Sequence, residues 1–133
     1  MPKWVLHGDP AFKNFLFNNA WGIVGLIDYE KIEYNCILWD LADQIRSYLK
    51  VDWFHKRELQ LLLKAYQDIR LLTDNELDAL PSYLTMMILN TCTQYLLGLF
   101  EKSDFSNNIG SRSDSLSKIE RCFNEIEKVK LLF

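Results

Sequence analysis

The first 30 positions group their hydrophobic residues into short runs separated by polar turns. Trp4 to Leu6 is one such run, and the stretches 14–18 (NFLFN) and 21–28 (WGIVGLID) are rich in branched and aromatic residues. Such residues favour strands, whereas Asn and Ala at 18–20 are typical of a tight connection. The pattern predicts a strand, a turn and a second strand, which together form a small β-hairpin.

After this region the apolar positions recur every three or four residues, as in helices. Helices are predicted at 38–50 and 54–72, and a last helix is predicted from about residue 115, after a polar loop at 103–115. The residues expected to face the core are Leu38, Leu41, Ala42, Ile45 and Leu49 in the first helix, Leu59, Leu62, Ala65, Tyr66 and Ile69 in the second, and Leu116, Ile119, Phe123, Ile126 and Val129 or Lys130 in the last.

A further helix is expected between these, and its start is marked by two residues. Thr73 and Glu76 have the spacing of a capping box, and Pro81 is expected in the first turn of the apolar helix that follows. The uncharged stretch 79–100 is long enough to span a bilayer, but it contains several polar residues and a proline. We therefore favour a helix buried among other helices over a membrane span.

Composition narrows the class of protein. The chain has 133 residues, 49% of them hydrophobic, which is enough for one domain covering 1–133 with its own core. The formal net charge of −3 argues against binding to nucleic acid. Cys36, Cys92 and Cys122 are odd in number and widely spaced, so neither a disulfide framework nor a zinc site is predicted. The start of the chain lacks a signal-peptide pattern, and we expect a cytoplasmic protein.

The residues with the clearest chemical meaning lie near the start of the chain. His7, Gly8, Asp9 and Asn14 form the pattern H-G-D-x-x-x-x-N, and Asp28 follows fourteen residues later at the end of an apolar strand. This arrangement resembles the catalytic loop and metal-binding Asp of the protein-kinase-like fold. It is most similar to the aminoglycoside phosphotransferase and choline kinase-like families, including spore-coat kinase-like proteins.

The resemblance implies ATP- and Mg²⁺-dependent transfer of a phosphoryl group to a hydroxyl of a small molecule. It assigns Asp9 as the catalytic base that orients the hydroxyl or accepts its proton, and Asn14 and Asp28 as ligands of the metal. His7 would be structural, with its ring hydrogen-bonded to the backbone around the loop. The acceptor is left open between a sugar, an amino alcohol and an amino acid.

The resemblance extends over residues 4–50 and assigns three further positions. The stretch 39–42 (WDLA) matches a D-L-A element in which Asp40 would support the catalytic loop from the start of a helix. Leu16 and Ile27 match positions at the floor of the nucleotide pocket. Lys13 could contact a phosphate, although a solvated surface lysine is the favoured interpretation.

Only six residues precede His7, whereas a kinase of this type needs an N-terminal lobe with a glycine-rich loop before its catalytic loop. We therefore expect an α+β, predominantly helical fold: the C-terminal lobe of a protein-kinase-like fold without its N-terminal lobe. Residues 1–30 would form the hairpin with the catalytic loop and metal-binding Asp, and residues 36–133 a helical subdomain.

Two functions remain open. The chain is either a phosphotransferase lobe that an N-terminal lobe completes, or a non-catalytic interaction module that forms a homodimer through exposed apolar residues. A decaying reading frame with no retained role fits the same residues. A purely structural Asx-rich turn is the alternative interpretation of the motif itself. The apolar residues expected on the exposed surface are Leu6, Phe15, Leu16, Phe17 and Ile23.

Overall fold

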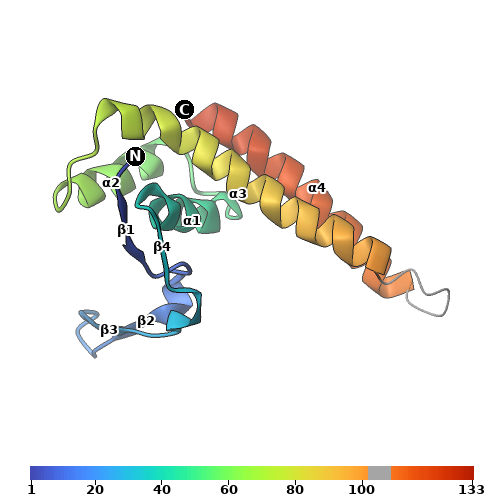
Figure 1. Cartoon of the computed structure of the whole chain (residues 1–133), viewed down its shortest axis with the longest axis horizontal. Coiled ribbons are helices and arrows are strands. Elements are labelled where there is room, and N and C mark those ends of the chain that lie inside the picture. The colour runs from blue at the N-terminus through green and yellow to red at the C-terminus, as the bar shows by residue number, and fades with distance from the viewer. Residues whose placement is uncertain (102–108) are drawn as a thin grey trace.

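The structure, a computed structural model, is mainly helical and describes residues 1–101 and 109–133 (Figure 1). Within these residues the strands are β1 (Lys3–Leu6), β2 (Phe15–Phe17), β3 (Ile23–Leu26) and β4 (Glu33–Cys36), and the helices are α1 (Leu38–Leu49), α2 (Lys56–Gln67), α3 (Asp74–Glu101) and α4 (Ile109–Leu132). Two short 3₁₀ turns lie at Phe12–Asn14 and Tyr29–Lys31. The strands come first in the chain, and the helices follow.

The predicted hairpin is confirmed. β2 and β3 pair in antiparallel orientation, with Leu16 opposite Gly25. The side chain of Asn18 closes the turn, because its Oδ1 accepts hydrogen bonds from the backbone N–H groups of Ala20 and Gly22 at 2.9 and 2.8 Å. This is the local bonding for which Asn is favoured in turns.

A second pair of strands was not predicted. β1 pairs with β4 in antiparallel orientation, with Leu6 opposite Glu33, so the expectation of helix everywhere after the hairpin is wrong for this segment. β4 has the sequence EYNC, in which only Cys36 is buried. Such a short polar stretch has no apolar alternation to indicate a strand, and it is extended because β1 supplies its backbone partners.

The predicted core face of α1 is confirmed, since all five of its predicted residues are buried. α1 packs against α3 and α4, and its face forms the centre of the core together with Leu80, Leu84 and Ile88 of α3. The core thus lies among these three helices, and α1 also borders the strands and the loop that carries the motif (Figure 1).

The capping box at the start of α3 is formed. The side chain of Glu76 accepts a hydrogen bond from Thr73 N–H at 2.9 Å, and Thr73 Oγ1 accepts one from Glu76 N–H at 3.3 Å. Pro81 lies inside this helix, beyond its first turn, which corrects the predicted position. The helix continues through the proline because Leu80 and Leu84, on either side of it, are fully buried in the core.

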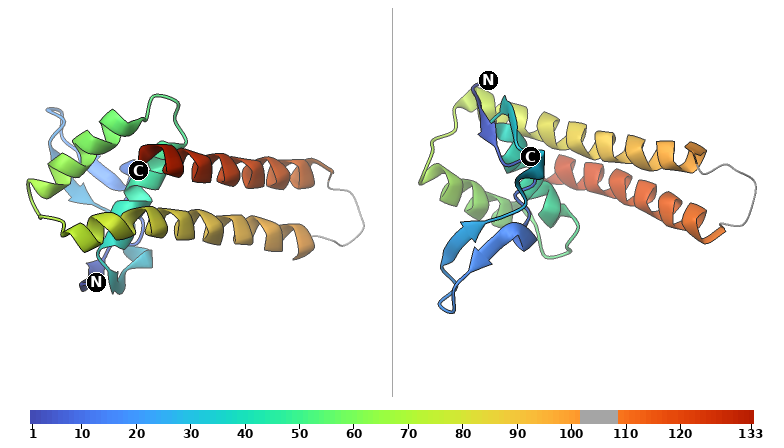
Figure 2. Two further views of the ribbon diagram at one scale, coloured as in Figure 1. Left: turned by 90° about the horizontal axis from the view of Figure 1, so that it is seen from above. Right: turned by 60° about the horizontal axis from the view of Figure 1, so that its bottom comes forward.

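α3 and α4 lie side by side in antiparallel orientation and extend well beyond the rest of the molecule (Figure 2). Only one face of α3 is buried along this hairpin, and Leu89, Leu96 and Leu97 are exposed. None of the helices in the described part of the chain is both long enough and apolar enough to cross a membrane.

Two of the predicted helix faces differ from the structure. Ile69 lies beyond the end of α2 and is 92% exposed. In α4, Leu116 and Phe123 are exposed, and the buried positions are Cys122, Glu125, Val129 and Leu132. The predicted core face of α4 is thus confirmed in part, since Val129 is buried and Ile119 and Ile126 pack against the core, while Leu116 and Phe123 do not.

The predicted loop before α4 is shorter than expected. α4 begins at Ile109, so residues 109–115 of the predicted loop are helical. Residues 103–108 of that prediction lie outside the described residues.

Candidate functional site

The backbone after β1 is held by the first turn of α1. Asp40 accepts hydrogen bonds from His7 N–H at 2.8 Å and from Gly8 N–H at 2.9 Å, one on each carboxylate oxygen. Two backbone donors with a charged acceptor form strong, well-oriented bonds. The start of the helix therefore fixes the direction in which the chain enters Asp9, which is the place the resemblance assigned to Asp40.

Gly8 occupies a position that excludes other residues. Its φ of +79° lies in the left-handed region, and an added Cβ would lie 2.2 Å from the carbonyl oxygen of Lys31. A side chain here would meet backbone, which cannot move aside as the end of a flexible side chain can. The glycine of the motif thus permits the close approach of the segment that leads into β4.

The ring of His7 joins two parts of the loop. Its Nε2 donates to the carbonyl oxygen of Ile27 at 2.9 Å, and its Nδ1 accepts from Asp9 N–H at 3.3 Å, so one neutral tautomer satisfies both bonds. The residue is buried, and its ring lies 4.9 Å from the ring of Tyr29. Both ring nitrogens are therefore used in holding the loop.

Asn14 connects the two ends of the loop. It is buried, its Nδ2 donates to the backbone oxygen of Asp9 at 2.8 Å, and its own backbone oxygen accepts from Ile27 N–H at 2.9 Å. Its Oδ1 has no hydrogen-bond partner among the described residues. This oxygen remains available to a ligand.

The carboxylate of Asp9 lies next to two lysines. Its Oδ2 is 3.3 Å from Lys31 Nζ and 3.7 Å from Lys13 Nζ, and its side chain is 18% exposed. Lys13, favoured as a solvated lysine, is well exposed but lies beside this carboxylate. Two positive charges thus lie close to one oxygen of the predicted base.

Asp28 follows directly after Ile27, which binds both His7 and Asn14. Its backbone is left-handed, with φ 70° and ψ 56°, and its exposed carboxylate has no partner among the described residues. No hydrogen bond joins the side chains of Asp9, Asn14 and Asp28 to one another in the described part of the chain. The structure brings the backbones of Asp9, Asn14 and Ile27 together, and Asp28 is placed at the edge of that group.

The oxygen atoms of Asn14 and Asp28 are of the type that Mg²⁺ prefers. Over the described ranges no group of three His, Cys, Asp or Glu residues is arranged to hold a metal ion. A magnesium site does not need one, because Mg²⁺ is commonly held by one or two carboxylates, water and the phosphates of a substrate. In donor type, Asn14 Oδ1 and the Asp28 carboxylate fit such an ion.

The two residues predicted at the nucleotide floor are partly open to solvent. Leu16 on β2 is 44% exposed, and Ile27 after β3 is 43% exposed. Of the residues predicted on an exposed apolar surface, Ile23 and Leu16 are exposed, but Leu6 is buried. The prediction for Leu6 is therefore wrong, since only 4% of this residue is exposed.

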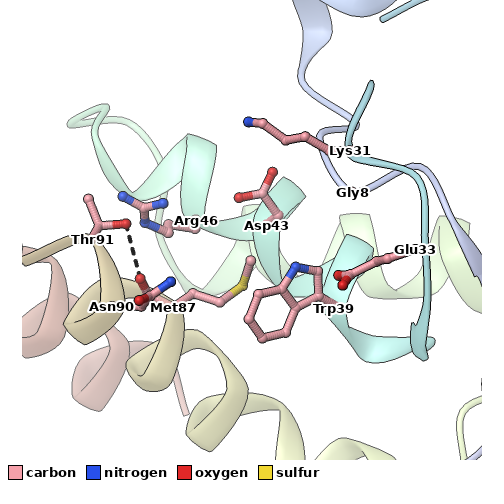
Figure 3. Close-up of a pocket in the computed structure, with 9 residues that line it drawn as sticks. All are labelled: Gly8, Lys31, Glu33, Trp39, Asp43, Arg46, Met87, Asn90 and Thr91. Atoms are coloured by element: carbon pink, nitrogen blue, oxygen red, sulfur yellow. Dashed lines mark hydrogen bonds between the residues drawn. The ribbon is translucent and has the colours of Figure 1, made fainter. Parts of the chain in front are cut away.

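A hollow of about 330 Å³ lies between the loop, α1 and α3 (Figure 3). Gly8 and Lys31 border it, so it is next to Asp9. Its other lining residues include acidic, basic, aromatic and hydroxyl side chains, among them Glu33, Trp39, Asp43, Arg46 and Thr91.

Two charged side chains of α1, Asp43 and Arg46, line this hollow. Burial raises the pKa of the Asp43 carboxyl, an effect that Arg46 only partly opposes. Arg46 Nε lies 3.6 Å from Glu125 Oε2, and both atoms are buried without a hydrogen bond in the described part of the chain. Sequence reasoning missed both residues. The sequence does contain a pattern that could have indicated them. Asp40, Asp43 and Arg46 are spaced three positions apart, so their side chains lie along one side of a helix.

Comparison with known proteins does not assign this chain to a family. A scan against family models, a search of curated proteins and a search of solved structures all give no significant match to this chain. The likeness of residues 4–50 to small-molecule kinases therefore remains a hypothesis drawn from the sequence motif.

Proposed function

We propose that this chain is the helical lobe of a small-molecule phosphotransferase and carries its catalytic base and metal ligands. The observation that carries the proposal is the hydrogen-bonded loop itself. Asp40 holds His7 and Gly8, His7 holds Ile27 and Asp9, and Asn14 holds Asp9 and Ile27. An ordinary polar turn does not need a carboxylate from a distant helix and a buried histidine to fix its shape.

The proposed roles follow from what phosphoryl transfer requires. Catalysis of this reaction depends mainly on positioning and on neutralising negative charge. Asp9 would orient the acceptor hydroxyl and receive its proton, and Asn14 and Asp28 would hold Mg²⁺. ATP, bound with Mg²⁺, supplies the phosphoryl group. Lys31, which lies 3.3 Å from Asp9, would add positive charge next to the group in transfer.

A second lobe is part of the proposal. Leu16 and Ile27 offer an apolar floor that is open on one side, and a nucleotide resting on it would be reached by water. A second segment or polypeptide that covers this floor would exclude water and complete the clamp on the phosphates. The resemblance to two-lobed kinases supports such a partner.

Calorimetric titration of the chain with ATP, with and without Mg²⁺, tests the proposal. We expect binding that requires the metal and that Asp28→Asn weakens roughly tenfold or more, because a charged ligand is lost. Glu30→Gln is the matched control: it removes an exposed carboxylate from the same turn, outside the proposed site, and should leave binding unchanged.

The outcome that would overturn the proposal is equally clear. If ATP fails to bind the chain alone and also fails with every candidate polypeptide for the second lobe, the phosphotransferase function is rejected. Equal effects of Asp28→Asn and Glu30→Gln would reject the metal site.

A second candidate function is supported by the exposed strands. Several large apolar residues on and next to the strands lie open to solvent, which favours a non-catalytic interaction module that associates through this surface. They are Trp4, Val5, Leu16, Trp21, Ile23, Val24 and Tyr34. On this proposal the motif residues serve only to hold the loop in shape.

A further inference from the structure

The hollow beside Asp9 is small and carries charges of both signs. Its volume of about 330 Å³ lies at the lower end of the range for ligand sites, so it has room for a compact molecule but not for one of several rings. Lys31 borders it and also contacts Asp9 at 3.3 Å, so a molecule in the hollow has the predicted base within its immediate surroundings.

Asp43 provides an acidic anchor in this hollow. The carboxylate is half-buried, and within the described ranges it makes no hydrogen bond and no ion pair within 4 Å; Arg46 and Lys31 attract it only from farther away. An ionised carboxylate that is partly removed from water without a partner is unfavourable. A positively charged ligand group at this point would relieve that cost. The indole of Trp39 and the carboxylate of Glu33 lie on the same side of the hollow and favour a cation as well (Figure 3).

Arg46 provides a basic anchor on the opposite side. Figure 3 shows its guanidinium group near Thr91, while Trp39 lies beyond Asp43. Its one ion pair in the described part of the chain is the 3.6 Å contact through Nε with Glu125, so its terminal nitrogens remain free of partners there. A guanidinium group with free terminal nitrogens is suited to bind a carboxylate through two parallel bonds.

Asp43 and Arg46 are one helical turn apart, yet they do not form an ion pair with each other within 4 Å. The Asp43 carboxylate and the terminal nitrogens of Arg46 are therefore both open to the oppositely charged groups of a ligand. From this we infer that the hollow binds a small zwitterionic hydroxy amino acid, with its ammonium group at Asp43, its carboxylate at Arg46 and its hydroxyl toward Asp9. The inference rests on the proposed function for the last of these contacts, because Asp9 acts on the hydroxyl only in a phosphotransferase.

Calorimetric titration of the full chain with L-serine and L-threonine, without nucleotide, tests the inference directly. Ethanolamine lacks the carboxylate of serine, and 3-hydroxypropionate lacks its amino group. We expect each of these two compounds to bind roughly tenfold or more weakly than serine, since each leaves one charged anchor unpaired.

Substitutions identify the anchors. Asp43→Asn should weaken serine binding tenfold or more, but it should not weaken the binding of 3-hydroxypropionate, which has no ammonium group to pair with Asp43. For the basic anchor we use Arg46→Gln together with Glu125→Gln, because the single change would leave Glu125 as an unpaired buried charge. This pair should weaken serine binding but should not weaken the binding of ethanolamine, which has no carboxylate to pair with Arg46. Asp68→Asn and Arg57→Gln, on exposed positions of α2 and its end, are the matched controls.

The results separate this inference from the proposed function. Serine binding with the expected charge dependence supports the pocket even if Mg²⁺-ATP never binds, in which case the phosphotransferase function alone is rejected. Equal binding of serine and ethanolamine overturns the zwitterion assignment in favour of an amino alcohol. Lack of binding by all four compounds, or binding that none of the substitutions changes in a protein with unaltered circular dichroism, also overturns it.

Discussion

Gly8 shows how strictly one residue of the motif is constrained. Gly8→Ala places a methyl group against the Lys31 carbonyl in a left-handed backbone, and we expect it to lower the free energy of unfolding by at least about 2 kcal/mol. Gly98→Ala is the matched control, because the space around Gly98 within α3 is open. It should stabilise the protein by about 0.5–1 kcal/mol. Urea denaturation of both variants measures the difference, and equal effects would contradict the close approach at Gly8.

Burial of the Asp43 carboxylate affects the stability of the folded protein. Because its pKa is raised in the folded protein, the folded state binds the proton more tightly than the unfolded chain. The ionised form is therefore destabilising at neutral pH, and this cost disappears as the pH falls through the raised pKa toward the ordinary value of 3.8. Asp43→Asn should raise Tm at pH 7 and have little effect near about pH 3. Thermal melts at both pH values check this, and a lower Tm at pH 7 would contradict it.

At the level of the elements, the start of α3 depends on one buried carboxylate. Glu76 binds Arg70 at 2.5 Å and also both donors of Thr73, and these bonds hold the pKa of Glu76 below its ordinary value. Glu76→Gln should cost about 2 kcal/mol at neutral pH. The stability that Glu76 provides is present above its ordinary pKa of 4.5 and is lost as the pH falls through its lowered pKa, so the effect should shrink in acid.

The more exposed cap of α2 supplies the control. Glu58 accepts from His55 N–H at 3.1 Å near the surface, so Glu58→Gln should cost only a few tenths of a kcal/mol. Denaturant titrations at pH 7 and in acid distinguish the two sites. An equal loss of unfolding free energy in the two variants would show that burial of Glu76 does not strengthen its cap.

These elements also show what sequence alone could predict. The helix α1, the hairpin β2–β3 and the Thr73 capping box were predictable because each depends on neighbouring residues and a regular pattern. β4 was not, since its pairing with β1 depends on contacts about 30 positions away, and neither was the buried Glu125, which depends on Arg46 of another helix. At the candidate site, the sequence motif predicted the loop. The hollow could not be predicted, because its lining residues come together only when α1 and α3 pack against each other and against the loop.

On the scale of the whole molecule, the strands present the apolar surface named above to solvent. If this surface mediates self-association, sedimentation equilibrium will show a mass that rises with protein concentration. Ile23→Lys should reduce the association strongly, because it places a charge within that surface. Leu131→Lys, at an exposed position near the end of α4, should not. A mass that stays at the monomer value over the whole concentration range would rule out the homodimer.

The two bonds that Asp40 accepts have one more consequence. The amide protons of His7 and Gly8 lie outside any strand or helix ladder, yet their acceptor belongs to a residue more than 30 positions later. Their exchange with deuterated solvent can proceed only when the loop and α1 separate. These two NMR signals would therefore serve as a built-in reporter of how often the motif detaches from its helical support, without any label being attached to the protein.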